Sequence, residues 1–218
     1  MTRPARLMRI ETALAALFPS GVAVAACDVA SADPGALWPA ERDAIAGAVP
    51  HRLAEFAAGR QAARQALAAL GHPAAALPMG PDRAPLWPSG IAGSIAHAAG
   101  IAVAAVRSGP PIGVDVEEDA ALSPDLWPVI LSPEEQRSLP PGDTGRQVRQ
   151  VFAAKEALFK AQDPATRAMF GFDAVAVALA NGGFDTTFLV GVGAFRSGQI
   201  VRGRMALVEG LILAGVAW

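Results

Sequence analysis

The sequence predicts a single-chain α+β protein, and three observations support this prediction. A long helical pattern over residues 52–70 leads into apolar strand patterns, and a second helical pattern over residues 146–162 leads into another set of strands. Hydrophobic residues make up 52% of the 218 residues, which is enough to bury a core and excludes a disordered chain. The repeated order suggests an internal duplication, but the residues of the two halves match too poorly to establish a repeat.

The chain up to residue 117 is predicted to contain a long helix, two shorter helices and three strands. Over residues 52–70 apolar side chains recur at helical spacing, and Gly71-His72-Pro73 supplies a stop. The other elements are a helix at 10–18, a strand at 22–29, a short helix opening at 40–43, and strands at 101–106 and 112–117. Because only a short turn separates the last two strands, they are predicted to pair antiparallel with each other.

After the strand at 112–117 comes a segment, residues 122–149, that proline interrupts repeatedly. Within it, Ser132-Pro133-Glu134-Glu135 predicts a short helix, because proline fits the first turn and acidic residues favour the positive end of the helix dipole. The predicted helix at 146–162 follows. Strands are then expected at 172–179, 184–192, 205–208 and 211–216.

The charge composition argues against a nucleic-acid-binding protein. Charged residues make up 17% of the chain, the formal net charge is −2 and the pI is near 5.9, so no extended basic surface is available to a polyanion. No segment approaches the roughly 20 apolar residues of a membrane span. A single cysteine, Cys27, excludes an intramolecular disulfide and a thiolate zinc cluster, and we expect a cytoplasmic protein.

The N-terminus presents an alternative, a non-catalytic exported lipoprotein. Three arginines in the first nine residues precede an apolar stretch that ends in VAAC at 24–27, similar to a bacterial lipoprotein cleavage site. Glu11 and the Pro-Ser-Gly break at 19–21 interrupt the apolar helix that a signal peptide needs. We therefore favour a helix, a turn and a buried strand containing Cys27 as a core residue.

Two acidic residues in the strand at 112–117 are candidate metal ligands. Residues i and i+2 of a strand share a face, so Asp115 and Glu117 point together while Val114 and Val116 point into a core. Hard carboxylate oxygens suit Mg²⁺, which completes its shell with water and substrate phosphate. An exposed strand end with clustered acids is an equally good interpretation of this short pattern by itself.

A second candidate set lies in the helix at 146–162. Helical spacing aligns Phe152, Glu156 and Lys160 and places Lys155 beside Phe159. Glu156 and Lys160 could be an ordinary surface pair worth only tenths of a kcal/mol. The phenylalanines indicate a face that is not plainly solvent-exposed, which favours a metal ligand or base flanked by phosphate-binding cations.

Five ordered motifs resemble the 4′-phosphopantetheinyl transferases that serve siderophore, nonribosomal peptide and polyketide synthesis, especially the branch of enterobactin synthase component D. They are EFAAGR at 55–60, DRAPLWP at 82–88, GSIAH at 93–97, GVDVE at 113–117 and FAAKEALFK at 152–160. Ala96 stands where the family usually has Ser or Thr, and Ala153 where Ser, Thr or Cys is common. Hydroxyl hydrogen bonds from those positions are therefore absent here.

The resemblance implies a transferase that uses coenzyme A as substrate and Mg²⁺, with Mn²⁺ as a substitute. Asp115, Glu117 and Glu156 would hold the metal against the coenzyme pyrophosphate, and Lys155 and Lys160 would neutralise its oxygens. The phosphopantetheine arm would pass to a serine of an acyl or peptidyl carrier protein, releasing adenosine 3′,5′-bisphosphate. Glu156, directly or through a metal-bound water, is the expected base, and other proton acceptors stay open.

The resemblance also implies where the coenzyme binds. Arg52 and Arg60, about two helical turns apart, are expected at its 3′-phosphate and adenine end, although two helix arginines are as often a solvated face. Ser94 and His97 are expected to contact the coenzyme phosphates, and Arg83 likewise with a looser alignment. A lone histidine beside an apolar strand is otherwise more often structural. Whether Arg64 or Glu118 contributes stays open.

The family fold implies two similar α/β halves with a pseudo-twofold arrangement, a coenzyme-binding half at 1–111 and a metal and catalytic half at 112–218, with the site between them. Two fused halves make a monomer sufficient.

The carrier protein is expected to dock on the segment 122–149, where apolar and basic residues suit an acidic amphipathic helix. These residues are Leu126, Trp127, Ile130, Leu131, Arg146 and Arg149. The rival enzyme is a Mg²⁺-dependent nuclease or phosphodiesterase, which the slightly acidic charge disfavours.

Overall fold

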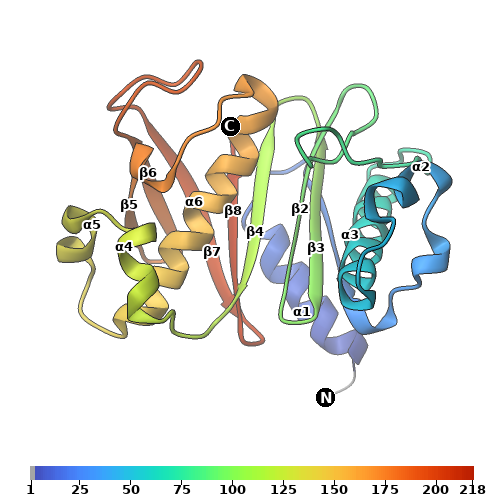
Figure 1. Ribbon diagram of the computed structural model, residues 1–218, viewed down its shortest axis with the longest axis horizontal. Helices are drawn as coiled ribbons and strands as arrows, with labels where there is room; N and C mark the ends of the chain where they lie inside the picture. Colours follow the sequence, from blue (N-terminus) through green and yellow to red (C-terminus); the bar gives the residue numbers. More distant parts are fainter. Residues whose placement is uncertain (1–2) are drawn as a thin grey trace.

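The structure, a computed structural model, describes residues 3–218 and contains two antiparallel sheets side by side (Figure 1). The first sheet has the order β1-β3-β2 and the second β4-β8-β7-β6-β5. The strands are β1 (Ala23–Asp28), β2 (Ile91–Ala98), β3 (Ile101–Ser108), β4 (Ile112–Glu118), β5 (Val175–Ala180), β6 (Gly183–Phe188), β7 (Ile200–Val208) and β8 (Leu211–Ala217). The α-helices are α1 (Arg3–Ala15), α2 (Pro39–Arg42), α3 (Pro50–Ala69), α4 (Trp127–Ile130), α5 (Pro133–Ser138) and α6 (Thr144–Thr166). The predicted α+β class is confirmed.

Small side chains let helix α3 lie close to the first sheet. Pro50 occupies the first turn of α3, and Gly71, with φ of +75°, follows its end. The buried face of α3 consists mainly of alanine, and it packs against alanines of β1 and β3. The helix predicted over residues 52–70 is therefore confirmed.

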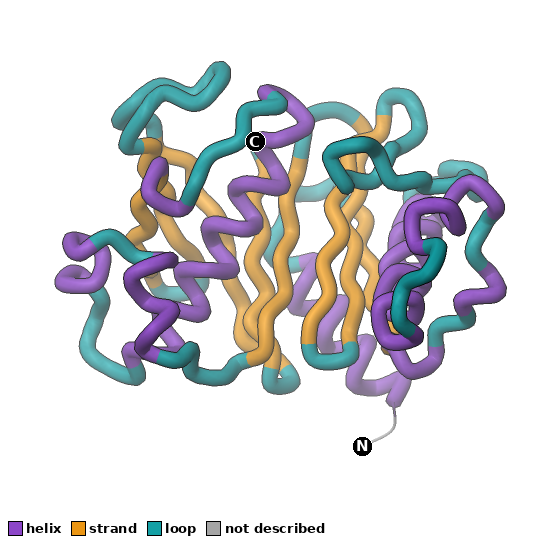
Figure 2. Tube along the Cα trace, in the orientation of Figure 1, coloured by secondary structure: helices purple, strands orange, loops and turns teal. Residues whose placement is uncertain are grey.

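Helix α6 covers one face of the second sheet, across β4 and β8 (Figures 1 and 2). The Asp143 side chain caps its start by accepting a hydrogen bond from the Arg146 amide. At Gly113 of β4, an added Cβ would lie 1.9 Å from the Ala157 carbonyl oxygen of α6. Only glycine permits this approach, so the position of α6 on the sheet is fixed at this point.

Helix α1 joins the two halves on the opposite side from α6. Its residues Ile10 and Leu14 share one core with strands of both sheets, including Val114 and Val116 of β4. A direct hydrogen bond also links the sheets, because the Val114 amide donates to Ser94 Oγ of β2 at 3.0 Å. The neighbouring edges of β2 and β4 are held together in this way.

The predicted pairing of the strands at 101–106 and 112–117 is wrong. β3 lies between β1 and β2, while β4 pairs with β8 in the other sheet. Both edges of β3 are therefore already used, and residues 109–111 carry the chain from one sheet to the other. The strand β2 was not predicted, and β7 begins earlier than the predicted residue 205.

The buried position of Cys27 disfavours the exported-lipoprotein alternative. Cys27 is 4% exposed, lies in β1, and packs in the core between the first sheet and α3. Its thiol contacts Gln65 Oε1 at 3.4 Å. Within residues 3–218, no helix is both long enough and apolar enough to cross a membrane.

Gly113→Ala should strongly destabilise the protein, because the new methyl group would meet the Ala157 carbonyl oxygen and the Ala161 nitrogen of α6 at 1.9 and 2.6 Å. We expect a loss of about 3 kcal/mol or more in the free energy of unfolding, measured by urea denaturation. The control is Gly191→Ala, where the nearest atom would be 3.7 Å away. Equal stability of the two variants would contradict the close contact between α6 and β4.

Candidate active site

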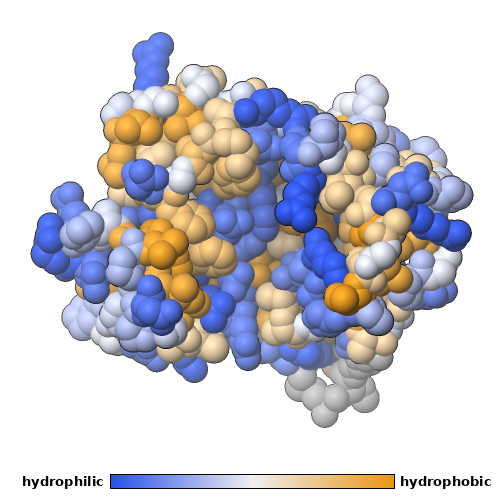
Figure 3. Space-filling model, viewed as in Figure 1, coloured by the Kyte–Doolittle hydropathy of each residue, from blue (hydrophilic) through white to orange (hydrophobic). Residues whose placement is uncertain are grey.

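A cleft of about 490 Å³ lies between the two halves. Its walls come from β2, from the loop at 82–87 and from α6, which contributes Glu156, Phe159 and Lys160. Hydrophilic residues gather along the middle of the corresponding face (Figure 3). The cleft thus brings together Arg83 and Ser94 from the first half with Glu156 and Lys160 from the second.

Asp115 lies on the α6 side of β4 and is paired with Lys160. Strand alternation directs Val114 and Val116 toward α1 and Asp115 toward α6. Lys160 Nζ donates to Asp115 Oδ1 at 2.5 Å, and Asp115 is 4% exposed. Its other oxygen, Oδ2, is buried and has no hydrogen-bond partner. One carboxylate oxygen is therefore available to an additional positively charged or donating group.

The charge state of Asp115 is set mainly by its burial. Burial raises the pKa of Asp115 from 3.8 to about 7. The charge and hydrogen bond of Lys160 lower this pKa, while the negative charges of Glu117 and Glu156 raise it further. Both other predicted metal ligands are thus close enough to Asp115 to repel its charge.

The three predicted metal ligands do not form a preassembled cluster. Glu117 forms an ion pair at 2.9 Å with Arg149 of α6, whereas Asp115 pairs with Lys160. Among the residues that the structure describes, no three His, Cys, Asp or Glu side chains are arranged to hold a metal ion. Two of the three carboxylates are therefore each paired with a basic residue of the same chain.

The chemistry of this region nevertheless fits a divalent cation. Asp115, Glu117 and Glu156 offer hard oxygen atoms, the ligand type that Mg²⁺ and Mn²⁺ take in proteins. The unpartnered Oδ2 of Asp115 and the mutual repulsion of the carboxylates are both relieved by a positive charge between them.

Arg52 and His97 meet around Glu55, a residue that the motif contained but to which no role was predicted. Arg52 Nη1 lies 2.7 Å from His97 Nε2, and His97 Nδ1 lies 3.3 Å from Glu55 Oε1. Burial lowers the pKa of His97, and the Glu55 charge opposes this shift. We assign the neutral tautomer with Nδ1–H toward Glu55, because Arg52 can only donate to Nε2.

Of the other expected coenzyme ligands, only Arg83 and Ser94 line the cleft, whereas Arg52, Arg60 and His97 lie outside its lining. Arg60 is buried, donates from Nε to the Leu77 carbonyl at 2.7 Å, and stacks on Phe56. Burial lowers the Arg60 pKa to about 10. Arg83 sits in a turn with φ of +68°. The Ser94 hydroxyl accepts a hydrogen bond from the Val114 amide, so it links the two sheets.

Comparison with protein families finds two matches that follow each other along the chain. Residues 40–107 match the 4′-phosphopantetheinyl transferase N-terminal domain, and residues 111–203 match the 4′-phosphopantetheinyl transferase superfamily. The 4′-phosphopantetheinyl transferase Svp of Streptomyces mobaraensis is 36% identical, over 94% of this chain and 88% of that protein. The chain belongs to the 4′-phosphopantetheinyl transferase family.

Other relatives agree with this assignment. The 4′-phosphopantetheinyl transferase PptT of Mycobacterium tuberculosis is 32% identical, over 96% of this chain and 99% of that protein. Enterobactin synthase component D of Escherichia coli is 37% identical over 55% of this chain and 59% of that protein. The protein is therefore an enzyme that transfers phosphopantetheine to carrier proteins, and neither the nuclease nor the non-catalytic lipoprotein alternative is retained.

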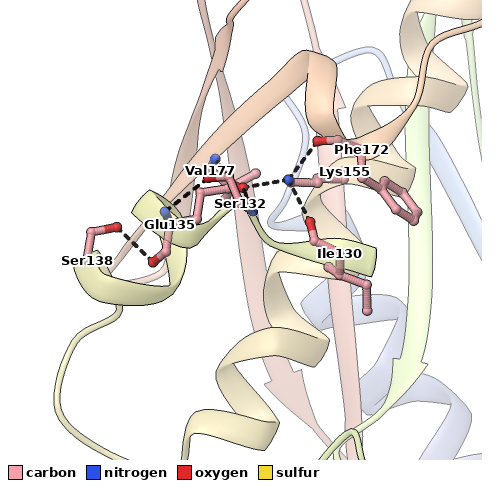
Figure 4. A network of polar contacts seen from close by, with 7 residues as sticks. All are labelled: Ile130, Ser132, Glu135, Ser138, Lys155, Phe172 and Val177. Carbon is pink, nitrogen blue, oxygen red and sulfur yellow. Dashed lines mark hydrogen bonds and ion pairs between the residues drawn. The ribbon is translucent and has the colours of Figure 1, made fainter. Parts of the chain in front are cut away.

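In this 4′-phosphopantetheinyl transferase, Lys155 does not take the position expected of a phosphate ligand. Its ammonium is buried and donates to Ile130 O, Glu135 Oε2 and Phe172 O at 2.8, 2.9 and 2.9 Å (Figure 4). An ammonium has only three protons, so none is left for a coenzyme phosphate. These contacts do not favour the predicted catalytic and coenzyme-binding role of Lys155.

Several ion pairs around the site were missed from the sequence. Arg167, at the end of α6, pairs with Asp82 in the loop across the cleft. Arg64, left open above, pairs with the fully buried Glu41 at 2.8 Å. These partners are 85 and 23 residues apart in the chain, so no local pattern could have connected them.

In metal-free buffer, the free energy of unfolding of wild type should decrease as the pH rises. Asp115→Asn should make this decrease smaller. The folded-state pKa of Asp115, about 7, lies above its ordinary value of 3.8, so the folded protein retains a proton that the unfolded chain releases. This contribution is present below about pH 4 and is lost as the pH rises through about 7. Between about pH 5 and pH 8, the unfolding free energy of wild type should fall by roughly 2 to 4 kcal/mol more than that of Asp115→Asn.

Identical pH dependence in the two proteins would show that Asp115 is ionised normally in the fold. Thr187→Val on β6, which removes no titratable group, serves as the mutational control.

Proposed function

We propose that this enzyme takes 4′-phosphopantetheine from coenzyme A, uses Mg²⁺, attaches the group to a serine of an apo carrier protein, and releases adenosine 3′,5′-bisphosphate. The observation that most supports this proposal is the pair of buried Asp115 with Lys160 beside Glu156 at the cleft, in a chain of this family. Family membership establishes the transfer of phosphopantetheine to carrier proteins. The proposal adds to this the donor, the metal, the acceptor serine and the leaving group.

Asp115, Glu117 and Glu156 would hold Mg²⁺, or Mn²⁺ in its place. The buried Oδ2 of Asp115 supports this assignment, because it is the one side-chain oxygen of the pair with Lys160 that lacks a partner. When bound, the metal would supply positive charge to the pyrophosphate oxygens of the coenzyme. Arg149 would have to share or release Glu117.

The side chains of α6 would then act directly on the reacting groups. Lys160, already at the cleft wall, would neutralise a pyrophosphate oxygen. Glu156 would accept the proton of the carrier serine hydroxyl as its oxygen forms the new bond to phosphorus. The bond from that phosphorus to the bridging oxygen breaks, and the electron pair leaves on adenosine 3′,5′-bisphosphate. The same bonds form and break if another group in the cleft accepts the proton.

The coenzyme would span the cleft and the Arg52–His97 cluster in the first half, residues 1–111, while residues 112–218 supply the metal and catalytic groups. Arg83 would reach the phosphates from the loop at 82–87. Arg52 is exposed and His97 is partly buried, and their common partner Glu55 is an anion that a phosphate can replace. Arg60 retains guanidinium donors beyond the one used on Leu77.

We infer that the carrier protein docks in a groove beside α4, the α4 groove. It has a volume of about 210 Å³ and is lined by Leu122, Leu126, Val129, Ile130, Arg149, Phe152 and Phe172. The sequence had indicated Leu126, Ile130 and Arg149 for this role; Trp127 and Leu131 instead pack against the core, and Arg146 is half exposed beside Asp119. An apolar area over α4 is visible in Figure 3.

Continuity with the cleft supports this occupant. Phe172 lines the α4 groove and also a second hollow of about 300 Å³, which contains Glu156 and Phe159. Glu156 and Phe159 line the cleft as well. A carrier helix in the α4 groove would therefore place its modified serine near Glu156. Because one chain supplies the cleft, the Glu156 region and the α4 groove, we propose that a monomer is sufficient.

Purified protein with Mg²⁺ and coenzyme A should add the mass of one phosphopantetheine group to an apo carrier protein, measured by intact-mass spectrometry. A chelator should stop the reaction, and added Mg²⁺ or Mn²⁺ should restore it. Glu156→Gln should lower the rate by about a hundredfold or more at unchanged thermal stability, because the side chain lines the cleft and fills no core. Absence of the mass gain across a panel of carriers would refute the proposed donor and acceptor.

Val129→Asp should raise the KM for the carrier protein about tenfold and leave the KM for coenzyme A unchanged, because Val129 is 66% exposed in the α4 groove. The measurement is steady-state transfer with each substrate varied in turn. Leu207→Asp, an exposed apolar residue of β7 outside the groove, is the matched control. An unchanged carrier KM for Val129→Asp would exclude this docking surface.

A further inference from the structure

The ammonium of Lys155 joins three chain segments that are separate in sequence (Figure 4). Its acceptors are the Ile130 carbonyl at the end of α4, the Glu135 carboxylate in α5, and the carbonyl of Phe172, the first residue of the 3₁₀-helix Phe172–Ala174. Lys155 is 1% exposed, so water does not replace any of these bonds. The ammonium thus fixes the positions of all three segments relative to α6.

Glu135 extends the same network to the edge of the second sheet. Its two oxygens also accept from the Ser132 amide and the Val177 amide, both at 2.9 Å. Ser132 completes a capping box at the start of α5. Val177 belongs to β5, the outermost strand of the sheet, so Glu135 occupies an otherwise open strand edge. Lys155 therefore holds a carboxylate that is itself fixed at two further points.

Two of the three segments held by Lys155 contribute to the walls of the α4 groove. Ile130 and Phe172 both line it, and the Phe172 ring packs edge-on against Phe152 of α6 with 5.6 Å between centroids. Phe172 also borders the hollow that contains Glu156. The distance between the groove walls and Glu156 consequently depends on the bonds of one ammonium group.

The coenzyme cleft has no comparable dependence on Lys155. Its lining comes from β2, the loop at 82–87 and the part of α6 that carries Glu156 and Lys160. None of the three acceptors of Lys155 belongs to that lining. Loss of the ammonium should therefore disturb one substrate site and spare the other.

We propose that Lys155 is a positioning residue for the carrier protein: with Glu135, it holds the walls of the α4 groove in register with Glu156 and does not touch the coenzyme. This inference rests on the proposed function, in which the carrier docks in that groove. It assigns the two lysines of the motif at 152–160 different tasks, with Lys160 acting on the coenzyme and Lys155 on the carrier site.

The first half contains a matched pair that serves as a control. Glu41 is also fully buried, also stands in a short helix that begins with proline, and accepts from Arg64, the Leu77 amide and the Trp38 amide. None of the residues in this second network lines the α4 groove. Glu41→Gln therefore removes a comparable buried ion pair that lies away from the carrier site.

The test measures both KM values and the melting temperature for Lys155→Met, Glu135→Gln and the control Glu41→Gln, using coenzyme A and the apo carrier protein that wild type modifies. We expect Lys155→Met and Glu135→Gln to raise the carrier KM about tenfold and to change the coenzyme KM by less than about twofold. Glu41→Gln should lower the melting temperature to a similar degree without raising the carrier KM. If Lys155→Met does not fold, Lys155→Arg retains the charge and should still raise the carrier KM, because a planar guanidinium does not match three acceptors arranged around an ammonium.

A raised coenzyme KM with an unchanged carrier KM would overturn the proposal and return Lys155 to the coenzyme. An equal rise in carrier KM for Glu41→Gln would overturn it too, because the effect would then follow from general destabilisation. A wild-type enzyme that modifies no carrier from coenzyme A refutes the proposed function itself. A wild type that is active, with variants of unchanged carrier KM, refutes only the role of Lys155.

Discussion

The close contact between α6 and β4 at Gly113 determines the geometry of the site. With no side chain at Gly113, the backbone of α6 approaches β4 directly, at Ala157 and Ala161. The next inward-facing residue of the strand on that side, Asp115, then meets Lys160 from the helix. Burying Asp115 is unfavourable for its charged form, and Lys160 offsets only part of this cost, as the raised pKa shows. A larger distance between α6 and the sheet would admit water and remove the cost of burying the Asp115 charge.

The two halves share a construction that their residues do not reveal. Each has a short helix beginning with proline, in which a buried glutamate accepts a hydrogen bond from the backbone amide of the residue before the helix and pairs with a basic residue on the long helix: Glu41 with Arg64, and Glu135 with Lys155. Each glutamate also accepts an amide from a more distant segment. Buried pairs of this kind add little net stability but penalise alternative arrangements. The common plan supports the duplication that the order of helices and strands suggested.

Cations of the predicted site are held by carboxylates of the same chain. Arg52 contacts Glu55, Arg149 contacts Glu117, and Lys160 contacts Asp115. A slightly acidic protein can thus keep a few cations ordered without a general basic field. Exposed pairs such as Arg52–Glu55 are worth only about 0 to 1 kcal/mol, so an incoming phosphate can compete for the arginine. The pair of Lys160 with the buried Asp115 is harder to rearrange.

The sequence by itself determined the local features of the site. Periodicity identified both long helices, and strand alternation placed Asp115 and Glu117 on one face, because these properties depend only on neighbouring residues. It could not separate Lys155 from Lys160, which lie in one helical motif but meet different surroundings. Which side of α6 faces β4, and which faces α4 and α5, is decided by packing between segments far apart in the chain. The same reason explains the wrong β3–β4 pairing: both edges of β3 are taken by β1 and β2, and only the tertiary structure shows which strands compete for an edge.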